Sequence, residues 1–201
     1  VLFRSSGHFG NWEMSIASFG IFGFKMAVVA RALDNPYLDD WFRNFRESTG
    51  HGMIDKRGGS KHMNQLLSEG KHLALLADQD AGQRGIFVDF FGTPASTFKS
   101  IALMAMEHDA IIVVGYSIRL PDNSHKNWVK FEMGCAGAVD PRDAVSDDPV
   151  HEITQKFTAA LEQAVARVPE QYFWVHRRWK TAAPEEHAKR VRSAGVSNDA
   201  A

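Results

Sequence analysis

The residues with the clearest chemical potential lie near the start of the chain, in the segment Gly7-His8-Phe9-Gly10-Asn11-Trp12-Glu13. His8 and Glu13 are five positions apart, so on one regular helix their side chains would point about 140° away from each other. They can meet only if His8 lies on a turn before a helix and Glu13 lies in its first turn, and the two glycines permit such a turn. A carboxylate that contacts an imidazole produces a general base able to accept a proton from a hydroxyl. We therefore interpret His8 as a base supported by Glu13; the structural alternative, more common for an isolated pair, is an ordinary capped helix.

Nucleophilic and metal-dependent chemistry have weaker support. The sequence has no G-x-S-x-G segment, and its single cysteine, Cys135, has no adjacent histidine, so we expect a small buried thiol there. No HxxxH or HExxH spacing occurs, and we expect no metal and no cofactor. The other eight histidines are assigned to surface positions or to interior sites where they are hydrogen-bonded.

Composition indicates one folded domain. The 201 residues are 44% hydrophobic, and 23 Lys and Arg against 24 Asp and Glu give a formal net charge of -1. This balance provides no global basic field, so we expect no nucleic-acid partner. No run approaches the roughly 18 apolar residues of a membrane-spanning helix. We place the domain in residues 1–180 and a loosely attached polar tail in 181–201.

Helical and strand-like segments alternate along the chain, which predicts an α/β fold with a mixed, largely parallel central sheet flanked by helices. The segment 81–97, with several glycines among phenylalanines, is expected to be a long functional loop. Helices are predicted after Gly10 and over 36–50, 60–69, 100–108 and 149–169, and strands over 24–30, 51–55, 73–77, 111–116 and 129–133.

The apolar strand 73–77 runs directly into Asp78, Gln79 and Asp80. Ligands collect at the carboxyl ends of strands in such sheets, so these side chains are candidates to reach one. Arg31 also follows a predicted strand and has two equally supported interpretations: it binds a phosphate, or it pairs with Asp34 and caps the next helix.

Other features have a functional and a structural interpretation. Arg84 is either a second phosphate contact or a solvated loop charge. Arg177, Arg178 and Lys180, among tryptophans, form either a basic and aromatic contact surface or ordinary packing with solvated charges.

Four segments together resemble one known family. GHFGNWE resembles the HX4(D/E) signature of glycerolipid-type acyltransferases, in the form found in bacterial lipid A biosynthesis acyltransferases, the late lauroyl and myristoyl transferases. Residues 31–36, residues 76–80 leading to 85–92, and residues 171–180 resemble the same family and occur in the family's order.

The resemblance implies transfer of a fatty acyl chain from an acyl carrier protein thioester to a hydroxyl of a lipid A precursor, with His8 as base and Glu13 in support. It implies a glycerolipid acyltransferase-like fold, here N-terminally truncated, and a membrane-associated enzyme at the cytoplasmic face of the bacterial inner membrane. The partners it implies are the acyl carrier protein, a glycolipid acceptor and a membrane surface. The candidate substrate-binding residues are Asn11, Arg31, Asp34, Asn35, Asp78, Gln79, Asp80 and Arg84. Asp78 and Asp80 are expected to organise the site through hydrogen bonds, and the phenylalanines at 87, 90 and 91 to line an acyl channel or, by default, to fill core.

Three alternatives remain open at this stage. The acceptor is another glycolipid, because the motifs do not identify it. The chain is a non-catalytic lipid-binding or carrier-binding domain. The histidine activates water instead of an alcohol, which would make the enzyme a hydrolase.

Overall fold

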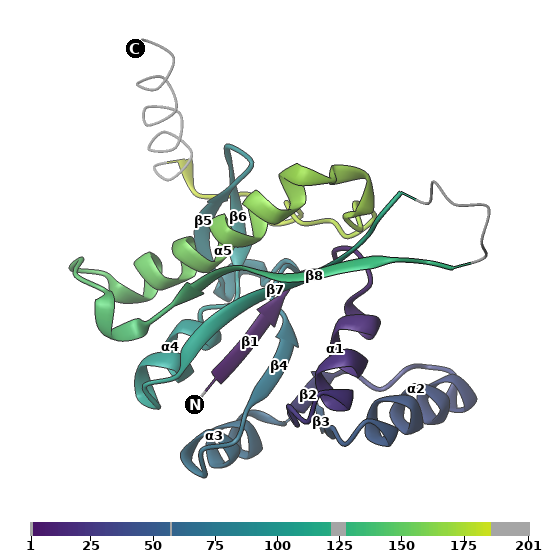
Figure 1. Cartoon of the computed structure of the whole chain (residues 1–201). Coiled ribbons are helices and arrows are strands. Elements are labelled where there is room, and N and C mark those ends of the chain that lie inside the picture. Colours follow the sequence, from purple (N-terminus) through teal and green to yellow (C-terminus); the bar gives the residue numbers. More distant parts are fainter. Residues whose placement is uncertain (1, 57, 122–127, 186–201) are drawn as a thin grey trace.

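A six-stranded sheet lies between two layers of helices in the computed structural model, which describes residues 2–56, 58–121 and 128–185 (Figure 1). The strand order is β3-β2-β4-β1-β7-β8; the first five strands are parallel and β8 is antiparallel to β7. The prediction of a mixed, largely parallel sheet is confirmed. The strands are β1 (Leu2–Ser6), β2 (Ala27–Ala30), β3 (Gly52–Asp55), β4 (Leu73–Leu76), β7 (Ile111–Arg119) and β8 (Phe131–Val139).

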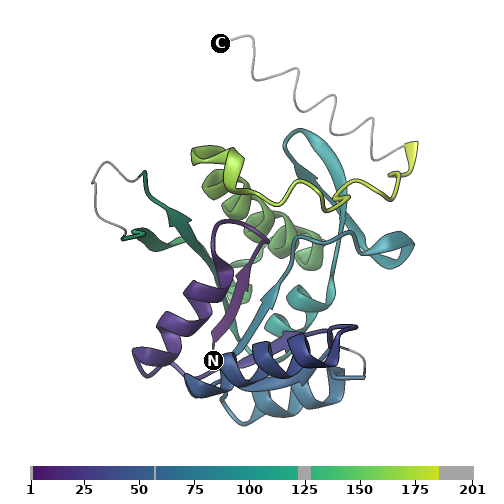
Figure 2. The same cartoon turned by 90° about the vertical axis from the view of Figure 1, so that its right-hand side faces the viewer.

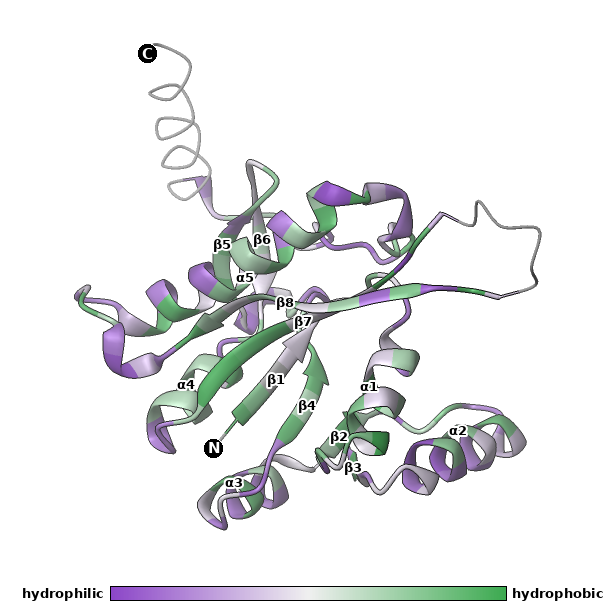
Figure 3. Ribbon diagram, viewed as in Figure 1, coloured by the Kyte–Doolittle hydropathy of each residue, from purple (hydrophilic) through white to green (hydrophobic). Residues whose placement is uncertain are grey.

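Of the central strands, β4 and the first part of β7 are hydrophobic, as is the start of β1, because both faces of the sheet are covered there (Figure 3). Phe3 on β1, Leu73 on β4 and Ile112 on β7 are completely buried. These three adjacent strands form the centre of the molecule, and their carboxyl ends therefore occupy fixed positions.

The helices divide between the two faces as right-handed crossovers require. The helices α1 (Trp12–Ile21) and α2 (Pro36–Ser48) lie on one side, and α3 (Ser60–Ser68), α4 (Ser100–Glu107) and α5 (Pro149–Arg167) lie on the other (Figure 1). The side changes because the chain moves outward from β1 to β3 and then returns inward to β4 and β7. No helix within the described residues is both long enough and apolar enough to cross a membrane.

The segment 81–97 is not the long loop that we predicted. After a short 3-10 turn, η1 (Gly82–Arg84), it forms an antiparallel hairpin of β5 (Ile86–Phe90) and β6 (Thr93–Thr97). Phe91 and Gly92 both have positive φ, at 54° and 68°, the backbone of a tight two-residue hairpin turn. Pro94 is tolerated because β6 has no second neighbouring strand.

The segment that follows α5 crosses above the carboxyl ends of the strands and reaches the β5–β6 hairpin (Figure 2). It is held against the turn after β1: Phe173 N donates to His8 O at 2.9 Å, and Gly10 N donates to Gln171 O at 3.0 Å. The last motif of the sequence therefore lies directly beside the first.

Candidate active site

His8 lies on the turn between β1 and α1, and its position follows from strand register. In the parallel pair of β1 and β4, Ser6 is opposite Leu76, so the residues two positions further along, His8 and Asp78, emerge side by side. His8 Nδ1 is 2.7 Å from Asp78 Oδ1, and the His8 backbone N–H donates to Asp78 Oδ2 at 2.6 Å. With Asp78 ionised, Nδ1 carries the proton, and Nε2 keeps a lone pair that can accept one.

The Asp78 carboxylate is almost fully buried, at 2% exposure. Burial by itself raises the pKa of this carboxyl, but the hydrogen bonds and the charge of His8 outweigh burial and leave the pKa of Asp78 below its ordinary value. Asp78 is therefore a carboxylate at neutral pH, and it can stabilise a positive charge on His8.

The expected contact between His8 and Glu13 is wrong. Glu13 does lie in the first turn of α1, as predicted, but its carboxylate accepts from Arg46 Nε at 3.0 Å and from Arg46 Nη2 at 2.5 Å. The planar guanidinium of Arg46, on α2, offers two parallel N–H groups that match a carboxylate better than one imidazole nitrogen does. Glu13 thus links α1 to α2, and Asp78 is the carboxylate that contacts His8.

Three rings surround the His8 imidazole. The Trp12 ring lies edge-on, with the ring centroids 5.1 Å apart, and the Phe173 ring is 6.4 Å away. The nearest ring is that of His176, at 4.2 Å in a T-shaped arrangement. The His8 side chain therefore lies in a partly enclosed aromatic environment, with an exposure of 15%.

The candidate residues on the loop after β4 also form hydrogen bonds. Gln79 Oε1 accepts from Lys56 Nζ at 3.3 Å, and the Asp80 carboxylate accepts from the backbone and hydroxyl of Thr181 and from Gly82 N. Asp80 therefore fastens the end of the crossing segment to this loop.

The remaining candidates contact neighbours close to them in sequence. Asn11 and Asn35 accept hydrogen bonds from the first turns of α1 and α2 as N-caps. Arg31 pairs with Asp34 at 3.4 Å on the surface, which confirms the ion pair of the structural interpretation, whereas the cap of α2 is Asn35. Arg84 is exposed in η1. The structure therefore brings together His8 and Asp78, and it places Arg31, Asp34 and Asn35 on the loop that starts α2.

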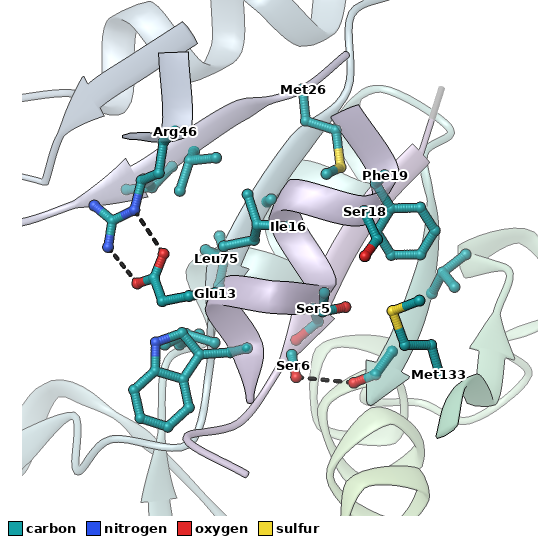
Figure 4. Close-up of a pocket in the computed structure, with 18 of the residues that line it drawn as sticks. Ser5, Ser6, Glu13, Ile16, Ser18, Phe19, Met26, Arg46, Leu75 and Met133 are labelled. Carbon is teal, nitrogen blue, oxygen red and sulfur yellow. Dashed lines mark hydrogen bonds and ion pairs between the residues drawn. The ribbon is translucent and has the colours of Figure 1, made fainter. Parts of the chain in front are cut away.

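An apolar pocket of about 500 Å³ lies between α1 and the sheet (Figure 4). His8 is not one of its lining residues, but Trp12, whose ring packs against His8, lines it together with Glu13. Its apolar lining includes Ile16, Phe19, Val29, Leu75, Val113 and Met133. Its size is in the range of sites for small organic ligands, about 300–1,000 Å³.

The burial of three further side chains, those of Phe90, Cys135 and Arg178, decides what was expected of them. Phe90 is completely buried and fills core. Cys135 is exposed, not buried, and lines the pocket. Arg178 is buried, at 2% exposure, so it is not part of a basic surface. Across the described ranges, no group of three or more His, Cys, Asp or Glu residues is arranged to hold a metal ion.

Comparison with known proteins identifies the family. A family model described as bacterial lipid A biosynthesis acyltransferase matches residues 2–181. The chain belongs to this family.

Individual relatives within or near this acyltransferase family act on more than one lipid. The chain is 27% identical over 177 residues to the lipid A biosynthesis lauroyltransferase of Escherichia coli, covering 87% of this chain and 54% of that protein. It is 28% identical over 195 residues to the phosphatidylinositol mannoside acyltransferase of Mycobacterium tuberculosis, covering 92% and 57%. The chain spans about half the length of the curated relatives it matches.

Sequence reasoning missed two residues of the candidate site. Arg46 is one of several charges on α2, and nothing in its spacing links it to Glu13. His176 was grouped with the surface and interior histidines, although it lies within the segment 171–180 that resembles the family. The position of His176 in this segment was the signal that could have identified it.

Proposed function

We propose that the protein to which this chain belongs transfers a fatty acyl chain to a hydroxyl of a glycolipid. The observation that carries the proposal is the pair of His8 and Asp78, in which Asp78 contacts Nδ1 and leaves Nε2 to accept a proton, next to Trp12, which lines an apolar pocket. Both the lipid A and the phosphatidylinositol mannoside relatives support an acceptor of the glycolipid class.

The mechanism follows from the protonation of this pair. His8 Nε2 accepts the proton of the acceptor hydroxyl while that oxygen attacks the carbonyl carbon of a thioester. Asp78 stabilises the imidazolium that forms, and His8 then gives the proton to the departing thiolate sulfur as the C–S bond breaks. This route forms no acyl-enzyme and requires no cofactor.

The pocket beside Trp12 is the proposed site of the acyl chain. Its lining is largely aliphatic and aromatic, and an acyl chain placed in it would bring the thioester to His8. Burial of each methylene contributes roughly 0.8 kcal/mol, so this pocket can hold a fatty acid without charged contacts.

The finer assignments follow the family. The proposed donor is an acyl carrier protein thioester, and the proposed acceptor is a lipid A precursor; a phosphatidylinositol mannoside is the alternative that the second relative favours. Arg31 and Arg84 are exposed and stay candidates for phosphate contacts.

A membrane-associated position at the cytoplasmic face of the inner membrane stays a prediction. The exposed apolar side chains of Ile21, Phe22 and Trp41 support contact with a membrane surface. Co-sedimentation of the protein with lipid vesicles tests this contact, and failure to bind vesicles would contradict it.

Replacing the base tests the function. We expect the protein to acylate a lipid A precursor from an acyl carrier protein thioester, and His8→Ala to reduce the rate about 10²- to 10⁴-fold. His62→Ala, exposed on α3, is the matched control and should keep wild-type turnover.

Each alternative has its own outcome in this assay. Equal turnover in His8→Ala would refute the assignment of the base. Binding of the carrier without transfer would favour a non-catalytic domain, and release of free fatty acid without an acylated acceptor would identify a hydrolase. A panel of glycolipid acceptors separates the two acceptor classes.

A further inference from the structure

The two histidines of the site are held together by the main chain. The backbone of Phe173 donates to His8 O at 2.9 Å, and His176 N donates to Phe173 O at 3.1 Å. The turn that carries His176 is therefore attached to the residue that it faces, and the two imidazoles contact each other at 4.2 Å between centroids.

The His176 ring has unused hydrogen-bonding capacity. Neither of its ring nitrogens has a hydrogen-bond partner among the residues that the structure describes, although its ring is only partly exposed. His51 is different: it is buried with Nδ1 accepting from Met26 N and Nε2 bonded to Ile16 O, the pattern of a structural histidine. A partly buried imidazole with both nitrogens free, next to a base, is arranged to bind a substrate group.

We propose that His176 donates a hydrogen bond from its ring N–H to the carbonyl oxygen of the donor thioester. This inference rests on the proposed function. While His8 Nε2 accepts the proton of the acceptor hydroxyl, the new C–O bond places negative charge on that carbonyl oxygen. The C–S bond then breaks, the carbonyl re-forms, and the proton passes from His8 to the sulfur. His176 keeps its own proton throughout.

The position and charge state of His176 fit this role. In the proposed mechanism the acceptor hydroxyl is hydrogen-bonded to His8 Nε2, so the carbonyl carbon that the hydroxyl attacks lies next to the His8 ring. The His176 ring packs against the His8 ring and is therefore within reach of this carbonyl group. Burial and the neighbouring His8 lower the pKa of His176, which favours the neutral form with one N–H. A neutral donor avoids a second positive charge beside the imidazolium of His8.

Two variants of the protein separate hydrogen bonding from packing. His176→Phe keeps an aromatic ring beside Phe173 but has no donor, and His176→Gln keeps a donor without the ring. Because the bond strengthens only as charge develops, we expect kcat of His176→Phe to fall about 10²-fold with the KM values for both substrates nearly unchanged. His176→Gln should keep a clearly higher kcat than His176→Phe. Thermal unfolding of both variants checks that they are folded.

The outcomes distinguish this inference from the proposed function. If the wild-type protein transfers acyl chains and His176→Phe matches it, or if His176→Phe exceeds His176→Gln, His176 acts only through packing and the inference is wrong. A raised KM with unchanged kcat would also overturn it, because the contact would then serve ground-state binding. If the wild-type protein transfers no acyl chain, the proposed function fails and this inference fails with it.

Discussion

At the scale of residues, the site depends on how a buried carboxylate is stabilised. Asp78 is seventy positions from His8 in the sequence, and it is almost completely removed from water. A buried carboxylate without partners would be strongly unfavourable. Both Asp78 oxygens accept from His8, one from the ring and one from the backbone, so the same contacts that orient the base also stabilise the charge.

This coupling predicts a specific dependence of stability on pH. The pKa of Asp78 in the folded protein lies below the unfolded value of about 3.9. The ionised carboxylate therefore stabilises the fold at pH values above about 4, and this contribution is lost as the pH falls through the folded-state pKa. Asp78→Asn removes the contribution, so its deficit in unfolding free energy relative to wild type should be largest near neutral pH and shrink below about pH 4.

Urea unfolding at a series of pH values between neutral and strongly acidic measures this deficit. Asp40→Asn, on the exposed side of α2, is the control and should follow the wild type at every pH. A deficit for Asp78→Asn that stays constant across the series would show that the carboxylate charge does not contribute.

The turn that carries His8 was predictable from the sequence, but the carboxylate that contacts His8 was not. Two glycines around His8 predicted the turn, and the strand before Asp78 predicted that this carboxylate lies at the sheet edge. The partner depends on which strands are neighbours: β4 pairs with β1, a fact of the folded sheet that spacing along the chain does not contain. Glu13 was chosen because it is near in sequence, and Arg46 on another helix takes it instead.

At the scale of elements, α1 has two roles. Its N-terminus follows the base, and its inner face closes one side of the apolar pocket against β2, β4 and β7. Glu13 fixes α2 to this helix, and none of the residues of α2 is buried, so the ion pair with Arg46 is a principal connection between the two helices. The geometry of α1 therefore controls the shape of the pocket.

A larger side chain on the inner face of α1 should shorten the acyl chain that the enzyme accepts. Ser18 lines the pocket, and Ser18→Trp fills part of its volume. We expect the variant to lose activity with long-chain donors and to keep activity with short-chain ones. Met14→Trp places the same side chain on the exposed part of α1, outside this pocket, and should leave chain preference unchanged.

Competition between donors of different chain length measures this preference in one reaction. The same product distribution in Ser18→Trp and wild type would exclude the pocket as the site of the acyl chain.

The helices and strands were predictable where local signals were strong. Asn35 before Pro36 and Asp148 before Pro149 predicted the starts of α2 and α5, because an acceptor side chain and a fixed φ favour the first helical turn. The β5–β6 hairpin was missed because Gly85, Gly92 and Pro94 indicated a loop. The hairpin makes its contacts with α5 and the crossing segment only in the folded protein; for example, Gln155 Oε1 on α5 accepts from Asp89 N at 2.7 Å.

At the scale of the whole molecule, the end of the chain completes the site at its beginning. The segment after α5 carries Phe173 and His176 to His8, and it continues to the β5–β6 hairpin. Arg178 anchors it there: Nη1 donates to Ser96 O at 2.6 Å and Nη2 donates to Thr97 Oγ1 at 2.5 Å. The basic pattern around Arg178 suggested a surface, because sequence alone does not show that the hairpin covers this one arginine and leaves Arg177 exposed.

Removing the anchor should destabilise the protein and also impair the site. In Arg178→Met, Ser96 O keeps its bond from Ala81 N but loses the one from Arg178, and the buried Thr97 Oγ1 also loses the hydrogen bond from Arg178. The loss of these two bonds costs about 1–3 kcal/mol of unfolding free energy. Because the same segment positions His176, we expect kcat to fall even well below the melting temperature, where the variant is fully folded. Arg177→Met, one position earlier and exposed, keeps these contacts and should match the wild type in both urea unfolding and acyl transfer. If Arg178→Met is destabilised but keeps wild-type kcat, Arg178 stabilises the fold without affecting the site. If Arg178→Met is as stable as Arg177→Met, the two hydrogen bonds of Arg178 do not hold the segment.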